Sequence, residues 1–249
     1  MKVPTIEGVI DRRILVNFQV DPAILASFLP PPFHPKTVRG VGIAGVCLIR
    51  LCDVRPQFLP RVLGISSENA AHRIAVTWEE NGQMCAGVYV PRRDSSSRFN
   101  VLMGGRLFPD FHHRATFTVD ETDTRYHVKL QSSDGETHLE VKAKVTDMLP
   151  ATSVFQSIEE ASAFFETGSL GYSPAAQADC YEGLELETFE WKIEPLEVQY
   201  IVSSFFQESQ VFPPSSVVFD CALLMRRIPH RWHTRPLLKL ASPSTESVG

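Results

Sequence analysis

The sequence predicts a mainly β protein, built on one long and mostly antiparallel sheet that closes on itself. Residues 113–119, 124–131 and 137–145 alternate between apolar and polar side chains and are joined by DETD and SSDGE, which is typical of a meander of strands. Asn81-Gly82, between two further strand-like segments, is the strongest short signal for a hairpin. Helical features are confined to short segments. Closure of the sheet would remove the exposed edges of so many strands.

The first predicted strand covers residues 14–20 and ends at Asp21. Asp21 is a favourable N-cap and Pro22 a favourable first helical residue, so a short helix is predicted over residues 22–29. A run of prolines then stops this helix.

Residues 41–54 are apolar and spaced by glycines, which predicts a strand buried on both faces. Residues 67–94 are the hairpin around Asn81-Gly82. Two more short helices are predicted, at 95–103, which ends in paired glycines, and at 157–166, which begins with a serine N-cap and glutamates. The remaining predicted strands are residues 186–206 and 215–227.

Composition narrows the class of protein. The chain has 249 residues, a net charge of −5 and no basic run, so nucleic acid is not an expected partner. Its longest apolar stretches are shorter than the roughly 20 residues of a membrane helix, so no membrane partner is expected either. No apolar signal core follows the N-terminus, which predicts a cytoplasmic location. The five cysteines form no CxxC pair and are interpreted as free thiols. One domain is expected over 1–240, followed by a flexible polar tail at 241–249.

Four segments occur in an order and spacing that resembles the acetoacetate decarboxylase superfamily: residues 12–33, 67–76, 87–94 and 104–113. The similarity is closer to an uncharacterised branch, the domain of unknown function 2071. It covers residues 10–120 well and the rest only by the number of strands. The resemblance implies an acetoacetate decarboxylase-like cone-shaped, closed antiparallel β-barrel whose interior cavity holds a small ligand.

The decarboxylases carry a lysine in the loop that follows a glycine-arginine pair, and this lysine forms a Schiff base with the substrate. When Gly105-Arg106 is placed on that pair, His113 falls on the lysine and Leu107 replaces a glutamate. An imidazole cannot form an imine, and none of the seven lysines lies in this loop. The sequence therefore predicts a protein that is not a Schiff-base decarboxylase.

Two residues are candidates for catalysis. The resemblance makes Glu68 the interior glutamate that acts as an acid or a base. His113 would complete an acid–base pair, because the pKa of an unperturbed histidine lies near neutrality. Strand alternation allows only one of His112 and His113 to face the interior, and the register of the resemblance favours His113.

Three further residues are candidates for substrate binding. Arg106 could hold a ligand carboxylate with its planar guanidinium. Arg12 or Arg13 could do the same, because the family has an arginine near the start of the first strand; the register leaves open which of the two faces the cavity. His72 shares a strand face with Glu68.

Each of these residues also has a purely structural interpretation. Arg106 could stabilise its loop by pairing with a carboxylate, and His113 could line the barrel wall without a role in function. Glu68, His72 and His113 could together bind zinc or iron, but no recognised ligand spacing supports a metal site. No metal or other cofactor is predicted.

Two functions remain open. The first is a small-molecule-binding protein of the superfamily that lacks the Schiff-base lysine, a carboxylate being one candidate ligand. The second is a lysine-independent enzyme that uses Glu68 and His113 for acid–base chemistry on a small carbonyl or carboxylate compound. A structural or interaction protein has only the aromatic-rich C-terminal third in its favour. A homo-oligomer is compatible with all three.

Overall fold

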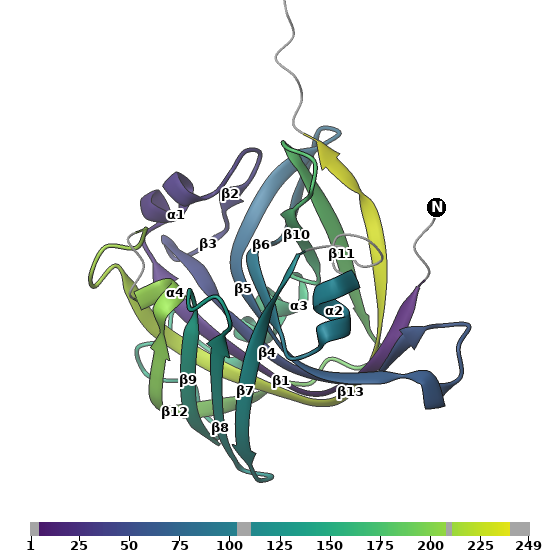
Figure 1. The fold of residues 1–249 in the computed structure, drawn as a ribbon. Helices are drawn as coiled ribbons and strands as arrows, with labels where there is room; N and C mark the ends of the chain where they lie inside the picture. Colours follow the sequence, from purple (N-terminus) through teal and green to yellow (C-terminus); the bar gives the residue numbers. More distant parts are fainter. Residues whose placement is uncertain (1–4, 104–110, 208–210, 240–249) are drawn as a thin grey trace, which may run out of the picture.

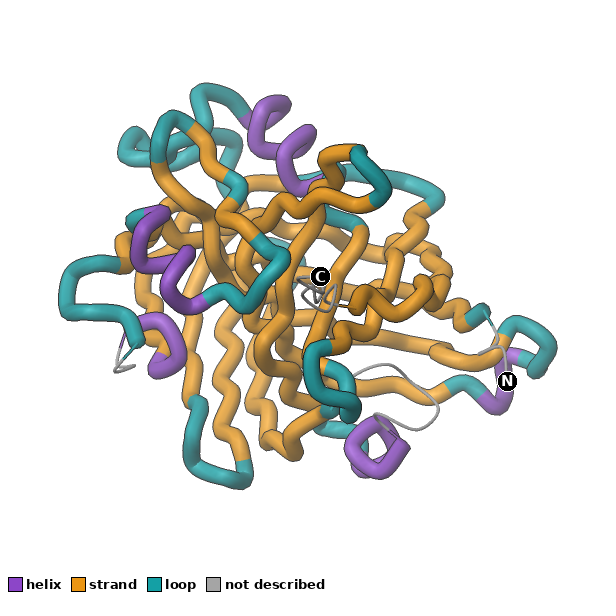
Figure 2. Tube along the Cα trace, turned by 90° about the horizontal axis from the view of Figure 1, so that it is seen from above, coloured by secondary structure: helices purple, strands orange, loops and turns teal. Residues whose placement is uncertain are grey.

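The computed structural model describes residues 5–103, 111–207 and 211–239. All strands belong to one thirteen-stranded sheet (Figure 1). The strands are β1 (Ile6–Val20), β2 (His34–Pro35), β3 (Thr37–Val38), β4 (Val41–Pro56), β5 (Ile65–Glu80), β6 (Gln83–Ser95), β7 (His112–Glu121), β8 (Arg125–Ser132), β9 (His138–Val145), β10 (Leu170–Pro174), β11 (Cys180–Thr188), β12 (Glu194–Ser203) and β13 (Val217–Lys239). The helices are α1 (Pro22–Phe28), η1 (Arg61–Leu63), α2 (Arg98–Met103), α3 (Ile158–Glu166) and α4 (Ser204–Gln207), and in Figure 2 they lie around the margin of the strands.

The sheet closes twice, which confirms the prediction of a closed, mainly β fold. β1, β4, β5, β6 and β13 are shared by two rings of hydrogen-bonded strands. β7, β8, β9 and β12 complete a nine-strand ring, because β7 pairs with β6 and β12 pairs with β13. β10 and β11 complete a seven-strand ring on the other side (Figure 1). β6 pairs in parallel with both β7 and β10, and the other pairings of the described strands are antiparallel.

Side chains at alternate positions of the shared strands pack into two different hydrophobic cores. Ile14 of β1 belongs to a large core that also contains Val128 of β8 and Val141 of β9. These strands lie on different sides of the nine-strand ring, so this core lies in its interior. Leu15 points to the opposite face of β1, into a second core that includes Phe165 of α3. Successive residues of a shared strand therefore belong to different sites.

The helix caps and the hairpin turn predicted from the sequence are found at the predicted positions. The Asp21 carboxylate caps α1 and the Ser157 hydroxyl caps α3, each by accepting a hydrogen bond from a backbone amide of the first turn, at 2.8 and 3.1 Å. Asn81 and Gly82 both have positive φ, 53° and 75°, as a tight hairpin turn between β5 and β6 requires. The predicted helices and the hairpin are confirmed.

The C-terminal third differs from its prediction. The predicted strand 186–206 is instead the end of β11, the whole of β12 and the short helix α4. β13 continues to Lys239, twelve residues beyond the predicted end at 227, because its second half pairs with β11. The predicted tail, 241–249, lies outside the described residues, and the domain boundary at 240 stays a prediction. Within the described ranges, no helix is long and apolar enough to cross a bilayer.

Candidate functional site

Four charged side chains from four strands form a set of ion pairs, here called the Arg12 cluster. Arg12 of β1 donates to Glu68 of β5 at 2.5 Å and to Glu121 of β7 at 2.6 Å. Arg50 of β4 donates from Nε to Glu68 at 2.6 Å and also pairs with Glu121. Arg12, Arg50 and Glu68 are neighbours across adjacent strands, whereas β7 pairs with neither β1 nor β4. Glu121 therefore reaches the cluster across the interior of the nine-strand ring.

The Arg12 cluster is partly buried, and the Asp11 carboxylate also lies 3.6 Å from Arg50. The Arg12 side chain is 2% exposed, against 16% for Glu68 and 24% for Glu121. Burial alone would lower the pKa of Arg50, but its hydrogen bonds and charge interactions with Glu68 and Glu121 outweigh burial and raise that pKa. The Nε of Arg12 is buried and makes no hydrogen bond within the described part of the chain. Buried donors of this kind rarely lack an acceptor in native proteins.

His72 lies four residues along β5 from Glu68 and on the same face. It is 1% exposed, and its ring lies 4.5 Å from that of Phe205. Its Nδ1 is 3.8 Å from the Asp94 carboxylate, and neither ring nitrogen has a hydrogen-bond partner among the described residues. Burial, and then the charge of Arg92, lowers the pKa of His72 to about 3. The imidazole is therefore neutral at pH 7.

His113 belongs to a different set of contacts. Its Nδ1 lies 2.9 Å from the Asp134 carboxylate, and its side chain is 42% exposed. Arg92 of β6 pairs with Asp134 at 2.8 Å and with the fully buried Asp94 at 2.9 Å. Burial raises the pKa of Asp94, although its hydrogen bond to Arg92 acts in the opposite direction. No hydrogen bond or ion pair of the described residues joins His113 to Glu68.

The structure brings two of the predicted site residues, Arg12 and Glu68, into direct contact, whereas His72 and His113 have other partners. Arg13 lies on the opposite face of β1, where it lines a small cavity. Arg106 lies outside the described residues. Within the ranges that the structure describes, no group of three or more His, Cys, Asp or Glu side chains is arranged to hold a metal ion.

Sequence reasoning missed Arg50 and Glu121. Arg50 had a signal, because it is the charge that interrupts the apolar run 41–49 in the middle of a predicted strand. Glu121 had none, because the sequence DETD is equally typical of an exposed turn.

Comparison with solved structures defines the fold class. An acetoacetate decarboxylase-like enzyme from Sphingomonas wittichii RW1 is 12% identical, with a TM-score of 0.57 over 97% of this chain and 94% of that one. Acetoacetate decarboxylase from Legionella pneumophila subsp. pneumophila str. Philadelphia 1 is 13% identical, with a TM-score of 0.56 over 96% and 87%. The enduracididine biosynthesis enzyme MppR, complexed with pyruvate, is 12% identical, with a TM-score of 0.55 over 97% and 91%. The chain therefore has the acetoacetate decarboxylase-like fold.

The sequence itself defines the family. The family model DUF2071, described as an uncharacterized conserved protein, matches residues 10–222, which is most of the chain. The protein belongs to this family. None of the curated proteins compared with the chain matches it.

Proposed function

We propose that this protein binds a small molecule inside its nine-strand ring, at Arg12 and Glu68, and holds it without a covalent bond. The observation that carries the proposal is the buried Nε of Arg12, which has no acceptor among the described residues although both Nη atoms are paired. His72, a neutral and buried imidazole on the same face, offers a donor and an acceptor further along β5. Arg106 would add a cation from its loop.

A small oxo acid is the ligand class that fits these groups best. One solved structure with the same fold is complexed with pyruvate. In the Arg12 cluster, the two guanidinium groups are held by two carboxylates, of which Glu121 is the more exposed. A ligand carboxylate would take acceptor positions on Arg12 and Arg50 in place of Glu121, since a planar guanidinium binds carboxylates in a two-point geometry.

The described lysines support non-covalent binding. Lys129 and Lys142 are about half exposed and contact Glu140, and Lys144 contacts Glu197. Lys36 lies on the opposite face of the shared strands, at the cavity that Arg13 lines. None of these ammonium groups contacts the Arg12 cluster.

Borohydride reduction tests the absence of Schiff-base chemistry. The protein is incubated with pyruvate or acetoacetate, reduced with sodium borohydride, and its intact mass is measured under denaturing conditions. We expect the mass of the untreated protein, because no described lysine forms an ion pair with the Arg12 cluster. A decarboxylase with the catalytic lysine, treated in the same way, is the positive control. A reduced adduct, on Lys36 or on any other lysine, would contradict the proposal.

The alternative function, acid–base catalysis by Glu68 and His113, stays a prediction. Glu68 contacts two guanidinium groups and His113 contacts Asp134. Proton transfer between Glu68 and His113 would need a bridging substrate or water. We therefore place ligand binding first.

A further inference from the structure

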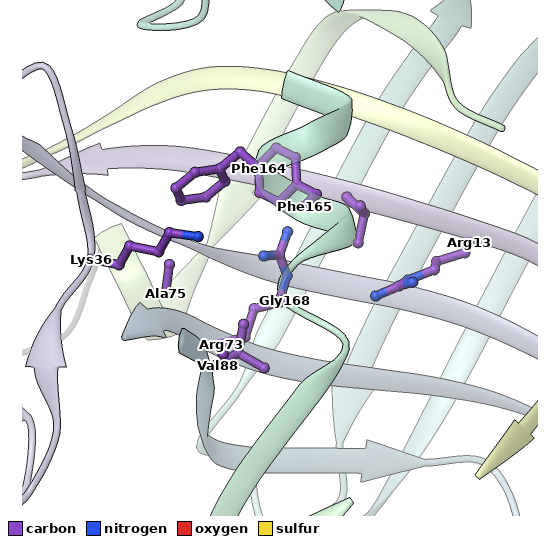
Figure 3. A pocket seen from close by; sticks show the side chains of 10 residues that line it. Arg13, Lys36, Arg73, Ala75, Val88, Phe164, Phe165 and Gly168 are labelled. Carbon is purple, nitrogen blue, oxygen red and sulfur yellow. The ribbon is translucent and has the colours of Figure 1, made fainter. Parts of the chain in front are cut away.

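A small cavity lies on the other face of the shared strands, and the charged side chains in its lining are all cations. It lies beneath α3 and has a volume of about 30 Å³. Its charged lining residues are Arg13 of β1, Arg73 of β5 and Lys36, and none of the described lining residues is acidic. In Figure 3, Arg13 and Lys36 reach toward its centre from opposite sides, with Phe164 and Phe165 above. The protein as a whole carries a net charge of −5, so this local excess of positive charge is unusual.

Arg73 is the most deeply buried of the three cations. It is 5% exposed, and its guanidinium lies 5.0 Å from the Phe165 ring. One Nη donates to the Asn17 side-chain oxygen at 2.5 Å, while the buried Nε has no partner within the described residues. Burial lowers the pKa of Arg73 to about 10, so the group is still cationic at neutral pH. A buried charge without an opposite charge is costly, and proteins normally pair it.

The other two cations also have no carboxylate partner among the residues that the structure describes. Arg13 donates to the Cys47 Sγ at 3.1 Å and to the Met225 Sδ at 3.8 Å, and it lies 5.9 Å from the ring of Trp191. Lys36 donates to the Thr167 hydroxyl at 2.9 Å and lies 4.4 Å from the Phe164 ring.

Charged residues close to the cavity in the sequence or in space are paired with carboxylates or held by several hydrogen bonds, whereas the three cations that line it have no carboxylate partner among the described residues. Arg12, one position earlier on β1, is paired with two carboxylates. Asp220 of β13 is fully buried, but its oxygens accept hydrogen bonds from Gln19, Ser153 and the Val154 amide. Asp220 is therefore held by neutral donors and is not paired with Arg73.

We propose that the cavity beneath α3 is a binding site for a small monovalent anion, a carboxylate group of one or two carbons or a halide, with Arg73 as its fixed counter-charge. A water needs roughly 10–15 Å³, so a cavity of about 30 Å³ holds a group about the size of two waters. The planar guanidinium favours a carboxylate, and the half-buried Lys36 provides a second cation at the margin. This site is separate from the Arg12 cluster and does not depend on the function proposed there.

Calorimetric titration with sodium formate and sodium acetate tests the anion site, with sodium chloride as the halide arm and sodium gluconate as a bulky control. We expect formate to bind the wild-type protein and gluconate to give no heat of binding. Arg73→Met should weaken formate binding at least tenfold, the loss expected for a hydrogen bond to a charged group. Lys36→Met changes a half-buried residue and should weaken it by a smaller factor, so it serves if Arg73→Met does not fold. Arg125→Met, which removes an exposed arginine of β8, a strand that does not line the cavity, should leave it unchanged.

Two results would overturn the anion site. The first is the absence of a binding heat for formate, acetate and chloride with the wild-type protein. The second is equal formate affinity in the wild type, Arg73→Met and Lys36→Met. Neither result bears on pyruvate binding at the Arg12 cluster, which is measured separately by the mass of the complex.

Discussion

Replacing Arg12 with methionine is expected to lower the free energy of unfolding by about 3–5 kcal/mol, the range for breaking a buried ion pair by removing one partner. Arg12 is 2% exposed and bridges Glu68 and Glu121. Without it, Arg50 alone faces the carboxylates of Glu68, Glu121 and Asp11, and negative charge stays in a partly buried position without a partner. Urea denaturation of the wild type and of Arg12→Met, at pH 7 and constant ionic strength, measures the difference.

Arg39→Met is the matched control for this measurement. Arg39 and Glu160 also form a close ion pair, but their side chains are 42% and 35% exposed. Pairs in solvent contribute about 0–1 kcal/mol, so this substitution should have little effect. Equal destabilisation by the two substitutions would show that the burial of Arg12 does not determine its contribution.

The stability of the protein is expected to fall steeply between pH 6.5 and pH 4.5, because of two buried histidines. Burial, and then the charge of Arg92, lowers the pKa of His72 to about 3; burial, and then the charge of Arg13, lowers that of His230 to about 4. In this range the unfolded chain binds protons on both imidazoles and the folded protein does not. Stability is therefore present above pH 6.5 and is lost on acidification, by about 2.5 kcal/mol for each histidine at pH 4.5.

The His72→Phe variant isolates one of these contributions. Phenylalanine retains a ring against Phe205 but has no group that titrates in this range. The loss of stability between pH 8 and pH 4.5 should be about half that of the wild type, as measured by urea denaturation at each pH. Asp94 acts in the opposite direction, because burial raises its pKa in the folded state, and it is present in both proteins. An unchanged pH dependence in His72→Phe would contradict the buried, neutral state of His72.

Local chemistry explains which parts of the fold could be predicted. The caps of α1 and α3 and the Asn81-Gly82 turn depend on neighbours within a few residues, so the sequence contains the whole signal. The second ring depends on pairings of the distant strand β13 with β11, and of β10 with β6. Such pairings are set by tertiary context, and a short strand has little pattern of its own.

The candidate site residues also divide into those that the sequence could identify and those that depend on the tertiary structure. The resemblance identified Glu68 and an arginine of the first strand, and the structure joins Glu68 to Arg12. The cavity beneath α3 could not be predicted, because it needs Arg13, Arg73 and Lys36 from separate segments on one face. The register of β1 decides that Arg13 faces this cavity and Arg12 the other side, and one residue of shift would exchange them.

Mass spectrometry of the Arg73→Met protein with pyruvate tests the central proposal most directly, because that substitution removes the fixed counter-charge of the cavity beneath α3. Spectra are recorded under native conditions and, after borohydride treatment, under denaturing conditions. We expect a one-to-one complex in the native spectrum and the mass of the unmodified protein in the denaturing one. The absence of a native complex, or an adduct that survives denaturation, would contradict non-covalent binding of a small oxo acid inside the nine-strand ring.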